Sequence, residues 1–305
     1  MEYHQKPGTI RVNTQIRFKR RATALALLLL LGAAPFANAQ KRPEPVKSLR
    51  LYIFDCGTLD MPDTERYNFK REELVTNLMS DACFLIVHPR GTLMWDTGVV
   101  PDGDFETKGA SRSGAPVKIG YATATKPLLP QLAAVGYSPK DITYVAFSHF
   151  HYDHVANGNA FAGSTWLVRQ KERDIMFAEP PSNRTVPANY AALKNSRTVI
   201  VKDDEYDVFG DGSVIMKSAP GHSPDHQVLL LKLAKTGPVL LSGDLWHYPE
   251  ERKFNRFPNT EFDVEQTKAS RAVIEAYLKK TGAQLWIQHD YTANQKLKKA
   301  PKFYE

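Results

Sequence analysis

The 305-residue sequence has only two cysteines, Cys56 and Cys83. Neither has the spacing of a thiolate metal site, and nothing around them suggests thiol-based catalysis. Each lies in an apolar run typical of a buried strand, which favours two buried thiols. In an oxidising compartment they could instead pair as a disulfide.

The sequence also has little charge imbalance beyond its N-terminal segment. Residues 1–39 hold six basic residues and one acidic residue, whereas the remaining 34 basic and 32 acidic residues nearly balance. The formal net charge of +7 therefore does not indicate a nucleic-acid partner. No internal repeat is present, and a hydrophobic content of 42% is enough for a substantial core.

The one long hydrophobic run is short for a membrane span. Residues 22–34 are apolar, follow Lys19-Arg20-Arg21, and precede Ala37-Asn38-Ala39. This order is typical of a cleaved secretory signal, with a retained transmembrane anchor as the alternative. We therefore predict a signal peptide over 1–39, a linker over 40–48 and one folded domain over 49–305. The expected location is secreted or periplasmic, with no stable membrane anchor after cleavage.

What the sequence does contain is a concentration of metal-binding side chains between Ser148 and His154. The preceding run 142–147 is typical of a buried strand, so this segment is expected on a loop at the strand's carboxyl end. His149 and His151 are two residues apart and point to one side in extended backbone, so they can share one metal ion. Asp153 and His154 follow where the chain turns, and can reach a second ion.

Three more residues that can bind metals follow apolar, strand-like runs elsewhere in the chain. His222 lies in a tight turn, Asp244 follows a buried run, and His289 ends another. Groups collected from several strand ends suit a dinuclear centre with a bridging carboxylate. His226, which begins a strand after the turn, is expected either to support a ligand residue or to have a structural role.

This set of residues resembles the motifs of the metallo-β-lactamase superfamily, over nearly all of residues 49–291. The resemblance implies an α/β fold, a single-domain four-layer αββα sandwich. It also implies that His149, His151 and His222 bind one metal ion. Asp153, His154 and His289 would bind the other, and Asp244 would bridge the two. Asp96, in Trp95-Asp96-Thr97-Gly98, matches a family aspartate that orients the ligand histidines.

Within this superfamily the sequence is most similar to the N-acyl-homoserine lactonases. The shared segments are Phe54-Asp55-Cys56-Gly57, Asp96-Thr97-Gly98, residues 219–227, Ser242-Gly243-Asp244 and Gln288-His289-Asp290. The resemblance implies that a hydroxide held by two divalent ions, zinc by default, opens the lactone ring, with Asp153 as a proton shuttle. This would quench quorum signals.

One position departs from the lactonase pattern. Those enzymes often have a tyrosine three residues after the bridging aspartate, where it contacts the lactone carbonyl. Here His247 occupies that position and Tyr248 follows it, so either is a candidate for this catalytic contact.

Other functions use the same ligands and stay open. A thioesterase of the glyoxalase II type would need a basic patch for glutathione, for which the candidates are Lys296, Lys298, Lys299 and Lys302. A phosphotriesterase or a non-catalytic periplasmic metal-binding protein could use the same ligand set. An apolar rim for an acyl chain is predicted from Met61, Tyr67, Phe69, Met79 and Phe105. These residues could equally lie in the core or at a homodimer contact.

The element pattern around these motifs can also be predicted. Residues 83–88 and 92–95 are expected to form a hairpin, and 127–135, 171–178 and 263–280 to form helices. Residues 101–123 are rich in Gly, Ser, Asp and Lys and are expected to form a long mobile loop.

Overall fold

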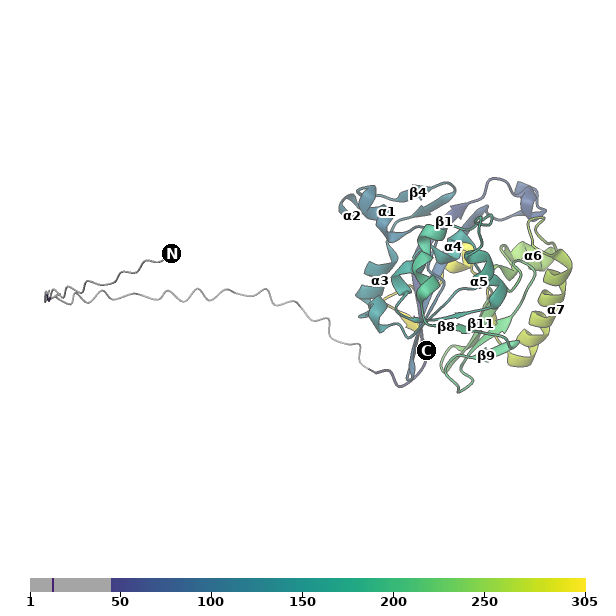
Figure 1. Ribbon diagram of the computed structural model, residues 1–305. Coiled ribbons are helices and arrows are strands. Elements are labelled where there is room, and N and C mark those ends of the chain that lie inside the picture. The colour runs from purple at the N-terminus through teal and green to yellow at the C-terminus, as the bar shows by residue number, and fades with distance from the viewer. Residues whose placement is uncertain (1–12, 14–44) are drawn as a thin grey trace, which may run out of the picture. The chain divides into compact units, whose positions relative to one another are not determined.

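Two mixed β-sheets face each other in the part of the chain that the structure describes, Asn13 and residues 45–305 (Figure 1). In this computed structural model the larger sheet has nine strands. They are β1 (Arg50–Asp60), β2 (Leu78–His88), β3 (Gly91–Trp95), β4 (Val117–Ile119), β5 (Ala122–Ala124), β6 (Tyr144–Ala146), β7 (Thr165–Val168), β8 (Thr198–Ile200) and β14 (Phe303–Tyr304). Their order is β4-β5-β1-β2-β3-β6-β7-β8, and β14 also pairs with β1.

The smaller sheet has five strands in the order β13-β12-β11-β10-β9. They are β9 (Glu205–Asp207), β10 (Val214–Ser218), β11 (Gln227–Leu233), β12 (Gly237–Leu241) and β13 (Gln284–Trp286). The strands β12 and β13 are parallel, as are β3, β6, β7 and β8 in the larger sheet. Several strands of both sheets therefore end in loops rather than in tight hairpins, and these loops are available to carry a site.

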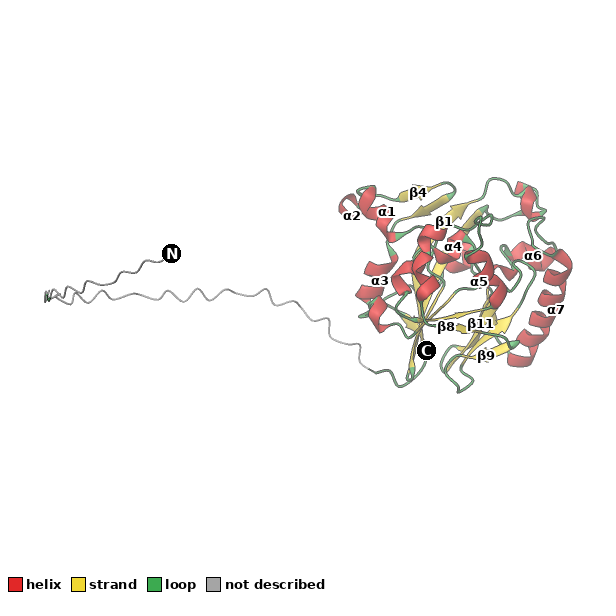
Figure 2. Ribbon diagram, in the orientation of Figure 1, coloured by secondary structure: helices red, strands yellow, loops and turns green. Residues whose placement is uncertain are grey.

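Helices cover the outer faces of both sheets. The α-helices are α1 (Asp102–Thr107), α2 (Ala110–Ser113), α3 (Leu128–Ala134), α4 (Tyr152–Val155), α5 (Gln170–Met176), α6 (Pro249–Phe254), α7 (Val264–Thr281) and α8 (Tyr291–Asn294). Short 3-10 helices are η1 (Glu65–Tyr67), η2 (Arg71–Glu73), η3 (Pro139–Asp141), η4 (Gly158–Phe161), η5 (Pro187–Asn189), η6 (Ala191–Asn195) and η7 (Gly243–Leu245). Figure 2 shows α3 and α7 on opposite sides of the strands.

The hydrophobic core has one layer between the sheets and one under each outer set of helices. Between the sheets, Ile53 and Phe84 of the larger sheet share a cluster with Leu229 and Leu241 of the smaller one. Leu132 of α3 packs with the outer face of the larger sheet, and α7 contributes Ile274 and Leu278 to a cluster with β11 and β12. Burial of each such side chain contributes about 2 kcal/mol. This order of layers confirms the predicted four-layer αββα sandwich.

The long helix α7 begins where the sequence predicts. The side chain of Asp263 accepts a hydrogen bond from the backbone N–H of Gln266, and Gly282 ends the helix in a left-handed conformation. The hairpin of β2 and β3 and the helices α3 and α5 also confirm the predicted pattern. No helix among the described residues has the length and apolar character needed to cross a membrane.

The loop prediction for residues 101–123 is wrong. This segment contains α1 and α2, and the hairpin of β4 and β5 begins in it and continues to Ala124. Phe105, Val117 and Ala122 are buried in one cluster with Leu59 and Met79. The glycine-rich composition of this segment is typical of a loop. Its short elements become ordered by packing against β1, which is distant in sequence.

The prediction of two buried thiols is also wrong, because Cys56 and Cys83 form a disulfide across β1 and β2. Phe54 pairs with Cys83 in the sheet register, and a bulge between Asp55 and Gly57 adds one residue at Cys56. The Cα atoms of the two cysteines lie 5.8 Å apart, which is within the range that a disulfide bridges. The sequence does not reveal a bulge, and therefore could not place the two sulfurs together.

Candidate metal centre

The seven predicted ligand residues lie together at the ends of strands. β6 leads to His149 and His151, and α4 carries the next pair, Asp153 and His154. The turn between β10 and β11 provides His222, while the segments after β12 and β13 provide Asp244 and His289. None of the seven residues is more than 7% exposed. The structure therefore gathers groups that span 141 residues of sequence, from His149 to His289, into one buried site.

The first cluster contains three histidines and one carboxylate oxygen. Nε2 of His149 lies 2.6 Å from Nδ1 of His151 and 3.2 Å from Nε2 of His222. Nε2 of His222 is 3.0 Å from Nδ1 of His151. Oδ2 of Asp244 lies 3.6 Å from Nε2 of His149 and 3.4 Å from Nε2 of His222. These four atoms can bind one ion.

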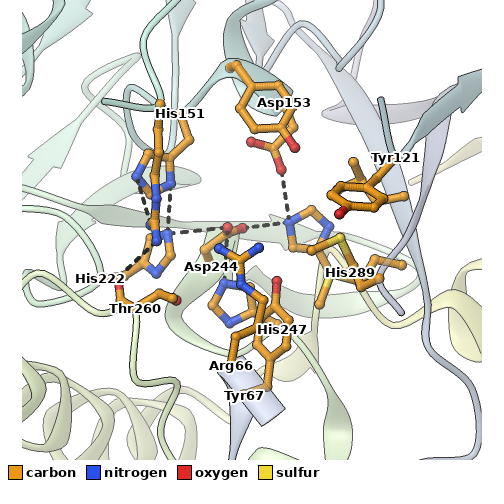
Figure 3. Close-up of a pocket in the computed structure, with 15 residues that line it drawn as sticks. Arg66, Tyr67, Tyr121, His151, Asp153, His222, Asp244, His247, Thr260 and His289 are labelled. Atoms are coloured by element: carbon orange, nitrogen blue, oxygen red, sulfur yellow. Dashed lines mark hydrogen bonds and ion pairs between the residues drawn. The ribbon is translucent and has the colours of Figure 1, made fainter. Parts of the chain in front are cut away.

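The second cluster contains the other oxygen of the same aspartate. Oδ1 of Asp244 lies 3.1 Å from Nε2 of His154 and 3.0 Å from Nε2 of His289. Oδ2 of Asp153 lies 3.7 Å from Nε2 of His289 and 3.9 Å from Nε2 of His154. Figure 3 shows Asp244 between His151 and His222 on one side and His289 on the other. Each oxygen of Asp244 thus faces one cluster, as a bridging ligand must.

Two buried atoms show that this geometry fits a bound metal. Nε2 of His154 and Oδ1 of Asp244 are inaccessible to solvent and have no hydrogen-bond partner among the described residues. Buried polar atoms are normally satisfied, and a cation between them would satisfy both. Burial, followed by the neighbouring imidazoles, lowers the pKa of His149 and of His151 well below the usual value, so both rings are neutral. Neutral imidazole is the form that binds metals.

The bridging carboxylate stays ionised despite its burial. Burial alone would raise the pKa of Asp244, but His289, His154 and His149 hold it well below its usual value. Asp244 is therefore available as an anionic ligand for both clusters.

Asp96 orients one ligand and the loop that carries the others. Its Oδ2 lies 2.9 Å from Nδ1 of His154, which directs Nε2 of that ring into the second cluster. Its Oδ1 accepts the backbone N–H of Ser148 at 2.7 Å, and its Oδ2 accepts the Ser148 hydroxyl at 3.0 Å. The position of Asp96 agrees with the orienting role predicted for it.

Two glycines let the ligand-bearing turns pack closely. Gly243 has φ +51°, and a Cβ there would lie 2.6 Å from Nε2 of His226 and 2.7 Å from Cβ of Ser148. Gly221 has φ +133°, and a Cβ there would lie 2.3 Å from the backbone N of Thr267. A side chain at either position would displace the ligand that follows it, Asp244 or His222.

His226 supports a ligand residue, which is one of the two roles expected from sequence. Its Nε2 accepts the backbone N–H of Asp244 at 3.0 Å, and its Nδ1–H donates to the carbonyl of Ala219 at 3.0 Å. Burial lowers its pKa to about 3, so the ring is neutral and can accept at one nitrogen while donating from the other. His226 therefore connects the β11 strand to the bridging ligand.

Glu172 on α5 is a supporting residue that the sequence analysis missed. Its Oε2 accepts the backbone N–H of Phe150 at 2.9 Å. Its Oε1 accepts the Ser223 hydroxyl at 2.6 Å and the backbone N–H of Asp225 at 2.9 Å. One buried carboxylate thus connects the loop of His149 and His151 to the turn of His222. No motif marks it, because its partners are mostly backbone groups.

The structure distinguishes between His247 and Tyr248, the two candidates for the contact with the substrate carbonyl. His247 lines the cavity over the metal site, and its Nε2 lies 3.4 Å from Oδ2 of Asp244. The Tyr248 hydroxyl instead donates to the carbonyl of Asn77 at 3.2 Å, and Tyr248 does not line this cavity. The position of Tyr248 therefore gives no support to its candidacy.

His247 is held by Glu251 and Tyr67. Its Nδ1 lies 3.2 Å from Oε1 of Glu251, at ion-pair distance though not aligned as a hydrogen bond. The ring of Tyr67 packs against it with centroids 5.1 Å apart. Burial opposes protonation, but Glu251 and Asp244 raise the pKa of His247 to about 10. Arg271 in turn pairs with Glu251.

The cavity above the ligands has a volume of about 110 Å³. Of the five predicted rim residues, Met61, Tyr67 and Met79 line it. All five are buried in one hydrophobic cluster, but Phe69 and Phe105 do not line the cavity, so these two belong to the core alone. The C-terminal lysines proposed for a thioesterase do not line the cavity; they are Lys296, Lys298, Lys299 and Lys302.

Further cavity residues come from segments that connect the strands and the longer helices, and only Tyr67 among them was predicted from sequence. We call them the cavity wall: Arg66, Tyr67, Tyr121, Arg184 and Thr260. Arg66 and Tyr67 belong to η1, and the others follow β4, α5 and α6. Figure 3 shows Thr260 beside His222 and Tyr121 beside His289, so the wall residues are distributed around the site. None of them has a spacing or a motif that would have signalled it.

The fold and the paired clusters define a dinuclear metallohydrolase architecture. A model of the metallo-beta-lactamase superfamily matches residues 78–289. The chain belongs to this superfamily, as its motif set predicted.

Its relatives include N-acyl homoserine lactonases. The lactonase AttM of Azorhizobium caulinodans is 30% identical over 230 residues, which cover 73% of this chain and 86% of the relative. AttM of Rhizobium radiobacter is 29% identical over 262 residues, which cover 84% and 98%.

Solved structures share the fold. An N-acyl homoserine lactone hydrolase with N-hexanoyl-L-homoserine bound at its catalytic metal centre has a TM-score of 0.68 and 23% identity, covering 85% of this chain and 100% of that one. AidC, a dizinc quorum-quenching lactonase, has a TM-score of 0.61 and 20% identity, covering 86% and 96%.

Proposed function

We propose that this protein is a metal-dependent hydrolase that opens the lactone ring of N-acyl-homoserine lactones and so quenches quorum signals. The observation that carries the proposal is the pair of ligand clusters that share Asp244, in a chain whose relatives include lactonases. Zinc is the default ion for this histidine and aspartate set.

The residues at the site are assigned different roles in hydrolysis. Two divalent ions held there would supply a hydroxide nucleophile at neutral pH and polarise the carbonyl under attack. Asp153, at the edge of the second cluster and lining the cavity, is placed to carry a proton to the departing alkoxide. His247 lines the same cavity at the position where lactonases have tyrosine, so we assign it the contact with the substrate carbonyl.

The cavity has an apolar part that suits an acyl chain. Leu59, Met61 and Met79 line it beside the metal ligands. Apolar lining with a few placed polar groups is typical of a small-molecule site. The C-terminal lysines predicted to bind glutathione do not line this cavity, which gives no support to a glutathione thioesterase.

The proposal is tested with a substrate panel on zinc-loaded protein of measured metal content. Butanoyl, hexanoyl and decanoyl homoserine lactones are incubated with the protein, and acid release is followed by pH-stat. We expect turnover of at least one lactone, and loss of turnover after chelation followed by recovery with zinc. Absence of turnover on every lactone, with two ions per chain present, would overturn the proposal.

Parallel assays address the competing functions. A glutathione thioester and an organophosphate triester are offered to the same preparation, and faster hydrolysis of either would replace the lactone assignment. If none of these substrates is hydrolysed, the result would favour the alternative of a non-catalytic metal-binding protein.

We also propose a secreted or periplasmic location. The Cys56–Cys83 disulfide supports it, because disulfides persist in oxidising compartments.

A further inference from the structure

Two hydrogen-bond donors face each other beside the first cluster. Nδ1 of His151 points to the ligand atoms of His149 and His222, so its Nε2 must carry the ring proton when that cluster binds an ion. This Nε2 lies 3.3 Å from Nη1 of Arg184. A guanidinium has only donors, so neither group can accept from the other. A third group that accepts from both would satisfy the pair.

The position of Arg184 is fixed by backbone contacts. Its Nη2 donates to the carbonyl of Thr260 at 3.2 Å, and its own carbonyl accepts the backbone N–H of Tyr152 at 3.1 Å. Its φ of +65° is in the left-handed region, which a non-glycine residue seldom adopts. The segment after α5 therefore holds this guanidinium against the ligand loop.

The charge of Arg184 is not matched by the described chain. Its two polar side-chain contacts among these residues, to His151 and to Thr260, involve no carboxylate. Glu261, which directly follows Thr260 in the chain, is an acidic residue that could be expected to pair with Arg184. That carboxylate lies 3.4 Å from Nδ1 of His222 and accepts the Thr267 hydroxyl at 2.8 Å, so it is committed elsewhere.

The cavity as a whole favours an anion. Arg66 lines it as a second guanidinium, and its buried Nε has no partner among the described residues. The carboxylates that line the cavity, Asp153 and Asp244, are both metal ligands. Two divalent ions more than balance them, which leaves both guanidiniums to attract negative charge.

We propose that Arg184 and the Nε2–H of His151 form a subsite for a carboxylate on the substrate. The protein then hydrolyses esters or lactones that carry an acidic group. Hydrolysis breaks the acyl C–O bond, water supplies hydroxide to the acyl carbon, and the proton goes to the departing alkoxide. A carboxylate fits because it accepts two roughly parallel N–H groups at once. This inference rests on ester hydrolysis at the proposed site, and does not require activity on homoserine lactones.

The test uses two esters that differ only in charge. Mono-4-nitrophenyl glutarate carries a carboxylate, and its methyl ester is the neutral counterpart. Zinc-loaded wild type, Arg184→Gln, Arg184→Lys and the control Arg173→Gln, on α5 outside the cavity, are compared. In Arg184→Gln we expect KM for the acidic ester to rise about tenfold or more, because a charged hydrogen bond is lost. KM for the neutral ester, and kcat for both, should change little, and Arg184→Lys should recover part of the preference.

A binding measurement separates this subsite from direct binding to the metal ions. Glutarate is titrated into each zinc-loaded variant by calorimetry, after zinc content and melting temperature are shown to match wild type. We expect affinity to fall about tenfold in Arg184→Gln and to stay unchanged in Arg173→Gln. Equal glutarate affinity in wild type and Arg184→Gln, or an equal rise in KM for both esters, would overturn the inference. If homoserine lactones are inert while the charge preference holds, the proposed function fails and the subsite stands.

Discussion

The seven ligands, five of which line the cavity, and the cavity wall are held in different ways. Each ligand follows a strand or begins a short helix, is nearly fully buried, and has supporting contacts such as those from Asp96 and Glu172. The wall residues come from connecting segments, and Tyr121 is 53% exposed. Arg184 is held mainly by backbone contacts.

This difference indicates that the ligands determine the chemistry, whereas the cavity wall determines the choice of substrate. Ligand positions must be accurate to fractions of an ångström, and buried strand ends provide that accuracy. Substrate contacts can vary among relatives without disturbing the ions, because loops tolerate change. Substitutions among the ligands should therefore change metal content, whereas substitutions in the wall or at His247 should change kinetics alone.

The largest expected effect follows from Asp244→Asn. The amide would place a donor where one of the two oxygens now faces a cluster, so one ion is lost and hydrolysis falls to background. Metal content by elemental analysis should fall from about two ions to about one per chain. Asp174→Asn, at an exposed position on α5, is the control and should keep both ions. Two ions and normal turnover in Asp244→Asn would contradict the bridging role.

An intermediate effect is expected from His247→Ala. If His247 contacts the substrate carbonyl, kcat should fall roughly 10²-fold, as when one preorganised donor is removed. Metal content should stay unchanged, and His247→Tyr should restore much of the activity because tyrosine also donates. Loss of an ion in His247→Ala would show that His247 is itself a ligand, and would break the distinction between ligands and substrate contacts.

The smallest effect on activity, and a distinct effect on stability, is expected from Glu172→Gln. Burial raises the pKa of Glu172 from 4.5 to about 7 despite the hydrogen bonds that it accepts. Because the folded pKa is the higher one, its contribution to stability is fully present below pH 4.5. It is lost as the pH rises to 7, by an amount on the order of 3 kcal/mol.

The measurement is the free energy of unfolding of metal-free protein between about pH 5 and pH 8. Glu172→Gln should show a smaller decrease with pH than wild type, and should be about 1–3 kcal/mol less stable at low pH, where one accepted hydrogen bond is missing. The exposed Glu106→Gln serves as the control. Identical pH slopes in wild type and Glu172→Gln would show that this carboxyl is ionised throughout.

Much of the ligand set was predictable because its signals are local. His149 and His151 follow a strand-like run at a spacing that puts both rings on one side, and Asp244 and His289 end similar runs. Asp96 was also identified, from its own short motif. The strand and helix patterns around them gave most of the elements, since hydrophobic periodicity reports which face is buried.

The errors arose where packing between distant segments decides the outcome. The short helices and hairpin within 101–124 are ordered by contact with β1, and the Cys56–Cys83 pair depends on one bulge. Glu172 and Arg184 contact mainly backbone groups. Every residue has such groups, so the partners of Glu172 and Arg184 could not be predicted from the sequence.

The sequence by itself determined the fold family and the set of histidines and aspartates available to bind metal, because side-chain types at strand ends limit which ions and which architecture are possible. Only the tertiary structure decided that Asp244 divides its two oxygens between the clusters and that His247, not Tyr248, faces the cavity. It alone placed Arg184 against His151. The physical reason is that these relations are distances between segments far apart in the chain, which are fixed when the two sheets pack together.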